Sequence, residues 1–123
     1  MTLPLVPGLR VYVAPGATDM RKSFDGLSAA VRQVLQEDPL SAHLFAFCNW
    51  RRTQLKLLLW DSTGFWVFAK RLERGTFAWP QPVPGAEKLS LSSEELAALL
   101  GGFAIDPSTR RRWWGREPVR LAQ

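Results

Sequence analysis

Cysteine and histidine are scarce in this sequence of 123 residues, which holds one of each, Cys48 and His43. A single cysteine leaves no internal disulfide, and two such ligands do not complete a zinc site. The same shortage removes a Cys–His or Ser–His nucleophile, because neither a second histidine nor an orienting partner accompanies His43. We therefore expect no metal and no cofactor, and we interpret His43 as structural and Cys48 as a buried thiol.

Long apolar stretches are also missing. No run of about 18 apolar residues is present, so the sequence predicts no transmembrane helix and no membrane partner. The opening residues, MTLPLVPGLR, lack a basic segment followed by a long apolar one, so no secretory signal is expected. Neither common spacing of a glycine-rich phosphate loop occurs. Together with the lone cysteine, these absences favour a cytoplasmic protein.

Positive charge is in excess and unevenly spread, with a formal net charge of +5. Residues 51–74 hold six basic and two acidic side chains, a net charge of +4. Residues 107–123 hold five arginines and one glutamate, again +4, whereas residues 75–106 carry one lysine against four carboxylates, a net of −3. Basic patches of this kind favour polyanions, chiefly nucleic acid, although a merely solvated surface has the same composition.

The stretch Leu44–Pro80 contains successive aromatic and aliphatic runs separated by short polar breaks. Runs of this length, bounded by turn residues, predict an antiparallel meander. We expect Gly64 and Gly75 to take the positive φ that tight hairpins require. The predicted strands cover residues 44–49, 54–61, 65–73 and a short fourth run, 76–79.

A short strand over residues 9–13 and two helices flank this meander. The first helix is expected to start between Thr18 and Ser23, either of which can cap it, and to end at Asp38 before a proline. Its apolar stripe has helical spacing. The stripe comprises Phe24, Leu27, Val31, Val34 and Leu35.

The second helix is marked by Ser92 with Glu95 three residues later, which is a capping box, and it stops at Gly101. The sequence thus predicts an α+β fold, with a small antiparallel meander sheet, one helix packed across it and a second C-terminal helix. Both faces of the meander are partly apolar, so one helix cannot cover them. Either the C-terminal helix or another chain is expected on the second face. Residues 1–105 are expected to form a single domain, followed by a basic tail over residues 106–123.

Clustered carboxylates would indicate a metal-dependent nuclease. The two aspartates near the first helix complement its dipole, Asp61 suits a turn, and Glu73 lies between two arginines. Because each has such a local role, we expect no catalytic residue. A nuclease that uses Asp61 with Asp19 or Asp25 is the least favoured hypothesis.

Basic side chains interleaved with aromatic ones are the strongest functional signal. Basic groups hold phosphates, and aromatic faces can stack on unpaired bases. For tryptophans inside the strands we favour core packing, whereas for Trp50, Trp113 and Trp114, each beside arginines, both interpretations stay open. The predicted nucleic-acid-binding residues are Arg51, Arg52, Lys70, Arg71 and Arg74 of the meander and Arg110, Arg111 and Arg112 of the tail.

Two long motifs in this order resemble a known family. Asp19–Leu27 reads DMRKSFDGL, and Lys70–Pro80 reads KRLERGTFAWP. With the intervening residues, they resemble the TnpB-type accessory protein of the insertion sequences numbered sixty-six, the product of their second open reading frame. The resemblance covers roughly residues 9–104. Trp50 departs from it, because the family usually carries a small, polar or basic residue there, and the tail after Asp106 lies outside it.

The resemblance implies a mobile-element protein that works beside a separate transposase, and it implies no catalytic residues. We expect a non-catalytic transposition factor, bacterial and associated with the nucleoid, that binds element-end DNA through the basic meander with weak sequence specificity. The rival hypothesis is a protein-interaction adaptor for the transposase without direct DNA binding. A homodimer is left open.

Overall fold

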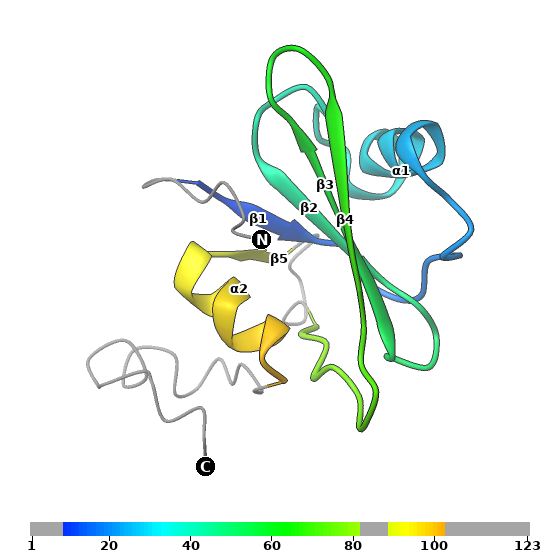
Figure 1. Cartoon of the computed structure of the whole chain (residues 1–123). Helices are drawn as coiled ribbons and strands as arrows, with labels where there is room; N and C mark the ends of the chain where they lie inside the picture. Colours follow the sequence, from blue (N-terminus) through cyan, green and yellow to red (C-terminus); the bar gives the residue numbers. More distant parts are fainter. Residues whose placement is uncertain (1–8, 82–88, 103–123) are drawn as a thin grey trace.

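The structure, a computed structural model, describes residues 9–81 and 89–102 (Figure 1). The described chain forms a sheet with the strand order β4-β3-β2-β1-β5 and helices on both of its faces. The α+β prediction is therefore confirmed. The elements are β1 Val11–Val13, α1 Phe24–Ala30, the π-helix η1 Val31–Leu35, β2 Leu44–Cys48, β3 Gln54–Trp60, β4 Phe65–Arg71, β5 Leu89–Leu91 and α2 Ser93–Leu100.

The sheet is mixed, which corrects the expectation of purely antiparallel pairing. β1 pairs with β2 in parallel, with Val11 opposite Leu44, because α1 and η1 form the crossover between them. β5, which the sequence did not predict, pairs antiparallel to the outer edge of β1. It is three residues long, too short for period-two alternation to be visible in the sequence.

The predicted meander is confirmed over β2, β3 and β4, which pair antiparallel in sequence order. The predicted fourth strand is wrong, because residues 76–79 pair with no strand. Phe77 and Trp79 are instead buried against the sheet, where the Trp79 indole donates a hydrogen bond of 2.9 Å to the carbonyl of Ala14. These aromatic residues therefore add to the core without extending the sheet.

Positive φ is found at Gly75, as predicted, with a value of 71°. The same expectation for Gly64 is wrong, because Ser62 takes that conformation in the β3–β4 hairpin, with φ of 79°. Asp61 Oδ1 accepts hydrogen bonds from the backbone N–H groups of Thr63 and Gly64. An aspartate that holds the turn in this way makes the left-handed conformation tolerable at Ser62.

Two hydrophobic clusters hold the layers together, one on each face of the sheet. On one face, Leu27, Val31 and Leu35 of the first helical segment pack on aromatic and aliphatic side chains of β2 and β3. On the other, Leu96 and Leu99 of α2 pack over β1, β2 and β3 together with residues 77–79. The C-terminal helix is thus the element that covers the second face, one of the two occupants expected for it.

The first helix is shorter than predicted. Ser23 occupies the N-cap position, as expected, but its side chain makes no capping hydrogen bond, and the helical segment ends at Leu35 where Gln36 turns left-handed, with φ of 52°. Phe24 and Val34 of the predicted stripe are 48% and 51% exposed. Val34 lies in η1, where the wider π-turn breaks the 3.6-residue period on which the stripe was based.

The second helix follows the prediction closely. Ser92 Oγ accepts from the N–H of Glu95 at 3.2 Å, and Glu95 Oε1 accepts from the N–H of Ser92 at 3.0 Å, so the capping box is present. The helix ends at Gly101, as predicted. None of the helices in the described ranges is long and apolar enough to cross a membrane.

Candidate nucleic-acid interface

The turn of the β2–β3 hairpin is closed by hydrogen bonds to one side chain, Asn49. Its Oδ1 accepts hydrogen bonds from the N–H groups of Thr53 and Gln54, at 2.9 and 3.1 Å, and its Nδ2 donates to Thr53 Oγ1 at 3.1 Å. The turn is thus closed from within by a residue at its base. Trp50 and Arg51 are left at the tip, and both are exposed, Trp50 to 80%.

The end of β4 lies beside this hairpin. Arg71 is paired with Gln54 at the start of β3, and the N–H of Leu72 donates to the carbonyl of Thr53 at 2.9 Å. The N–H of Phe77 donates to the carbonyl of Arg52 at 2.7 Å, so the chain after β4 stays alongside the same turn. The structure therefore brings all five predicted basic residues of the meander to one end of the sheet.

These basic residues do not form one flat patch. Lys70 and Arg71 are neighbours in a strand, so their side chains leave opposite faces of the sheet. Lys70 Nζ donates to the carbonyl of Leu100 at 2.8 Å, which places its charge at the C-terminal end of α2. Arg71 forms an exposed ion pair with Glu73 at 3.3 Å, the pairing anticipated for that glutamate. Both side chains thus already bond to other groups of the protein.

The Arg52 side chain is also bonded within the protein. One of its guanidinium nitrogens donates to the carbonyl of Gly16 at 2.8 Å, and the guanidinium lies 5.8 Å from the centre of the Trp79 ring. The side chain is half-buried and braces the segment after β1. Arg51 and Arg74, by contrast, are exposed and make no side-chain hydrogen bond or ion pair within the described residues. Of the five basic residues, Arg51 and Arg74 are thus the two whose guanidinium groups are not bonded within the described residues.

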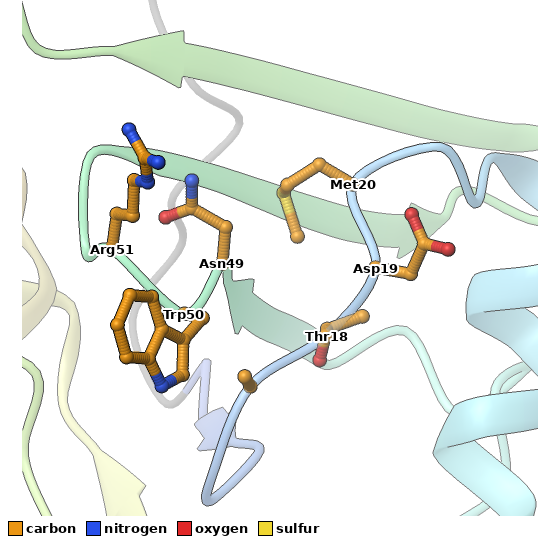
Figure 2. Close-up of a pocket in the computed structure, with 7 residues that line it drawn as sticks. Thr18, Asp19, Met20, Asn49, Trp50 and Arg51 are labelled. Atoms are coloured by element: carbon orange, nitrogen blue, oxygen red, sulfur yellow. The ribbon is translucent and has the colours of Figure 1, made fainter.

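A shallow hollow of about 390 Å³ lies between the hairpin tip and the segment that follows β1. Figure 2 shows Asn49, Trp50 and Arg51 on the hairpin side, facing Thr18 and its neighbours across it. The two segments are joined by a hydrogen bond of 2.8 Å from the N–H of Thr18 to the carbonyl of Cys48. The full lining is Ala17, Thr18, Asp19, Met20, Asn49, Trp50 and Arg51.

The carboxylate at this hollow is neutralised by its own neighbour. Asp19 accepts from the guanidinium of Arg21, with a shortest contact of 2.7 Å. This hydrogen bond lowers the pKa of Asp19 to about 2, so the carboxylate is ionised and paired at neutral pH. The sequence indicated that Asp19 lies at the start of the first helix, where it would complement the dipole. It lies instead ahead of α1, which begins at Phe24.

Asp61 and Asp19, two of the three aspartates considered for a nuclease, lie apart. Asp61 follows β3, whereas Asp19 lies beside the hairpin that precedes β3, so the length of that strand separates them. Asp61 serves the β3–β4 turn, and the Trp66 indole N–H that it accepts holds its pKa well below the ordinary range. In the part of the chain that the structure describes, no three His, Cys, Asp or Glu side chains are placed to hold a metal ion.

The lone histidine and cysteine have the structural roles expected of them. His43 Nδ1 accepts from the N–H of Arg10 at 3.3 Å, and its ring meets the edge of Tyr12 with centroids 5.7 Å apart. Cys48 is fully buried, and this burial raises the pKa of its thiol. The expectation of core packing for strand tryptophans is wrong for Trp66, which is 50% exposed.

Sequence reasoning missed the residue that positions one wall of the hollow. Lys56 Nζ donates to the backbone carbonyls of Met20 and Lys22, both at 2.8 Å, and so ties the segment before α1 to β3. A lysine between the leucines of a strand was the available signal. The predicted tail residues Arg110, Arg111 and Arg112 lie outside the described residues.

Comparisons with known proteins match this sequence to one family model and to two curated relatives. The sequence model of the family described as "IS66 Orf2 like protein" matches residues 9–110. Uncharacterized protein y4hO of Sinorhizobium fredii is 40% identical over 101 residues, which cover 82% of this chain and 86% of that protein. Uncharacterized protein y4jC of the same organism is 34% identical over 115 residues, which cover 94% and 95%. No solved structure matches.

Proposed function

The chain belongs to the IS66 Orf2-like protein family, and we propose that it is a DNA-binding accessory factor that works with the transposase of its insertion sequence. Association with an insertion sequence follows from the family. Binding to DNA is inferred from the end of the sheet at which the β2–β3 hairpin and the end of β4 meet. The proposed place of action is element-end DNA in the bacterial nucleoid.

One observation carries this proposal: Arg51 and Arg74 are exposed at the same end of the sheet, without partners among the described residues. A fully hydrated guanidinium with no internal bond is free to meet a phosphate oxygen. Backbone contacts of this kind position a protein on DNA but read no sequence. We therefore expect binding that is weakly sequence-specific and strongly dependent on salt.

The test is a double variant, Arg51→Ala with Arg74→Ala, titrated onto element-end duplex at several salt concentrations by fluorescence anisotropy. Each phosphate contact contributes a slope of roughly −0.9 in log affinity against log salt, so the double variant should flatten the slope by up to about two units. Arg52 is left intact because its bond to Gly16 supports the fold.

A matched control removes the same charge elsewhere. Arg10 is exposed at the start of β1, at the opposite end of the sheet, and Arg32 is exposed on η1. The pair Arg10→Ala with Arg32→Ala should leave the slope close to that of the parent protein. Equal slopes for the parent and the Arg51/Arg74 variant would show that this end of the sheet is not the DNA site.

An adaptor that binds the transposase through protein contacts is the second candidate. Trp66, 50% exposed, stacks on Phe68 with ring centroids 5.9 Å apart, on the edge strand β4. A hollow of about 360 Å³ adjoins Phe68, lined also by Leu57 of β3 and Leu100 of α2. An exposed tryptophan stacked on a half-buried phenylalanine beside an apolar hollow is typical of a protein contact. If Trp66→Ala abolishes capture of the transposase while the Arg51/Arg74 variant keeps it, the adaptor function is supported.

A further inference from the structure

Trp50 is exposed to an extent that the fold does not explain. At 80% it is the most exposed of the large hydrophobic side chains in the described residues, and the other exposed ones lie between 46% and 51%. Burial of an aromatic side chain is among the larger single contributions to folding, and Trp50 contributes almost nothing of this kind. The indole lies in solvent at the tip of the hairpin. The turn is closed by hydrogen bonds to Asn49 in which Trp50 takes no part.

The surroundings of Trp50 combine an open hollow of mixed polarity with positive charge. The hollow of about 390 Å³ beside the indole falls within the size range of small-molecule sites, and Thr18 and Met20 supply its opposite wall (Figure 2). Arg51 follows directly in the chain and is exposed. Asp19 also lines the hollow, but its charge is compensated by Arg21, so it does not oppose an incoming phosphate as a bare carboxylate would.

We propose that this hollow is a binding site for an unpaired base of single-stranded DNA, with Trp50 stacking on the base and Arg51 contacting a neighbouring phosphate. Every base has a π-face that an indole can cover, so such a site tolerates any sequence. In a duplex both faces of each base are already stacked, and Trp50 gains little there. This inference rests on the proposed DNA binding and adds the form of DNA that the hairpin prefers.

The experiment compares three fluorescein-labelled probes by anisotropy: a single strand, the same strand with every base replaced by an abasic site, and the matched duplex. The abasic strand keeps the phosphates and removes the stacking partner. One stacked base changes affinity about 5- to 150-fold, so the parent protein should bind the normal strand tighter than the abasic strand by that factor. It should also prefer the single strand to the duplex.

Trp50→Ala should bring binding of the normal strand down to the level of the abasic strand, with the salt slope unchanged because no charge is lost. Trp50→Phe should retain most of the difference, since a smaller aromatic face remains. Leu40→Ala is the control, an exposed apolar side chain of the segment that precedes β2, and should behave as the parent. The high exposure of Trp50 means that its variants should fold normally, which their melting temperatures would check.

The outcomes separate this inference from the proposed function. If Trp50→Ala binds the normal strand as tightly as the parent, the stacking site is wrong, whereas a flattened slope in the Arg51/Arg74 variant would leave DNA binding in place. If Trp50→Ala weakens duplex and single strand equally, the indole acts on paired DNA and the inference is overturned. If the parent binds no probe, both proposals are wrong.

Discussion

The two hairpins of the meander are built on the same plan but end differently. In the β3–β4 hairpin, Asp61 Oδ1 accepts from the N–H and Oγ1 of Thr63, both at 2.9 Å, and from the N–H of Gly64 at 3.0 Å. Its second oxygen accepts from the indole N–H of Trp66 at 2.7 Å. The carboxylate therefore closes the turn and also binds the tryptophan that follows it.

In the β2–β3 hairpin, Asn49 closes the turn through Oδ1 in the same manner, but its second atom is an amide nitrogen. That Nδ2 donates to Thr53 Oγ1, inside the turn, and has no acceptor to offer an indole N–H. Trp50 directly follows Asn49 in the turn and is 80% exposed, whereas Trp66 lies five residues after Asp61, in β4, and is bonded to it. The comparison teaches that both hairpins are closed by a side chain at their base, and that only the closing side chain of the β3–β4 hairpin also bonds a tryptophan.

The sharpest contrast is between two tryptophans at the same end of the sheet. Trp79 is 8% exposed and donates to Ala14, so Trp79→Ala should lower the free energy of unfolding by about 3–5 kcal/mol. Trp50→Ala should change it by no more than about 0.5 kcal/mol, because the ring is exposed. Urea denaturation of both variants measures the difference. Similar losses would mean that Trp50 packs into the fold after all.

The framing role of Asn49 gives the next largest effect. Asn49→Ala leaves two turn N–H groups without their acceptor and should reduce the free energy of unfolding by about 2–3 kcal/mol. Asn49→Asp is the matched control, since it keeps that acceptor, and its second oxygen can accept from the Thr53 hydroxyl to which the amide donates. Denaturation should therefore place Asn49→Asp close to the parent and Asn49→Ala below both. A variant Asn49→Ala as stable as the parent would show that the turn holds its shape without this side chain.

The smallest effect concerns the charge of Asp61. Its pKa is lowered in the folded protein, chiefly by the Trp66 N–H and then by the N–H of Thr63, so the ionised form stabilises the fold. This contribution is complete above the unfolded pKa of about 3.9 and is lost as the pH falls towards the lower folded value. Asp61→Asn should melt at a lower temperature than the parent at pH 7, and the gap should narrow below about pH 4. The pKa of Asp19 is lowered in both proteins, so Asp19 does not contribute to this difference in melting temperature. A difference in melting temperature that is the same at every pH would show that the charge of Asp61 does not stabilise the fold.

The candidate site was predictable in part. The position of the basic residues at one end of the sheet follows from strand order and alternation, which the sequence displays. The sequence does not reveal which of these residues are bonded within the protein, because Arg52 and Lys70 donate to carbonyls 36 and 30 residues away in the chain. The hollow beside Trp50 was likewise unpredictable, since its far wall is held in place by Lys56 through carbonyls more than 30 residues distant.

The sequence by itself determined the local structure: the three long strands, the capping box of Ser92 and Glu95, and the turn of Asp61. Each depends on residues a few positions apart, and the chemistry of a turn or a cap is complete within that span. Only the tertiary structure decided the parallel pairing of β1 with β2, the addition of β5 and the burial of Phe77 and Trp79. These features depend on which distant surface each segment meets, and an apolar residue in an irregular stretch carries no period that reveals its partner.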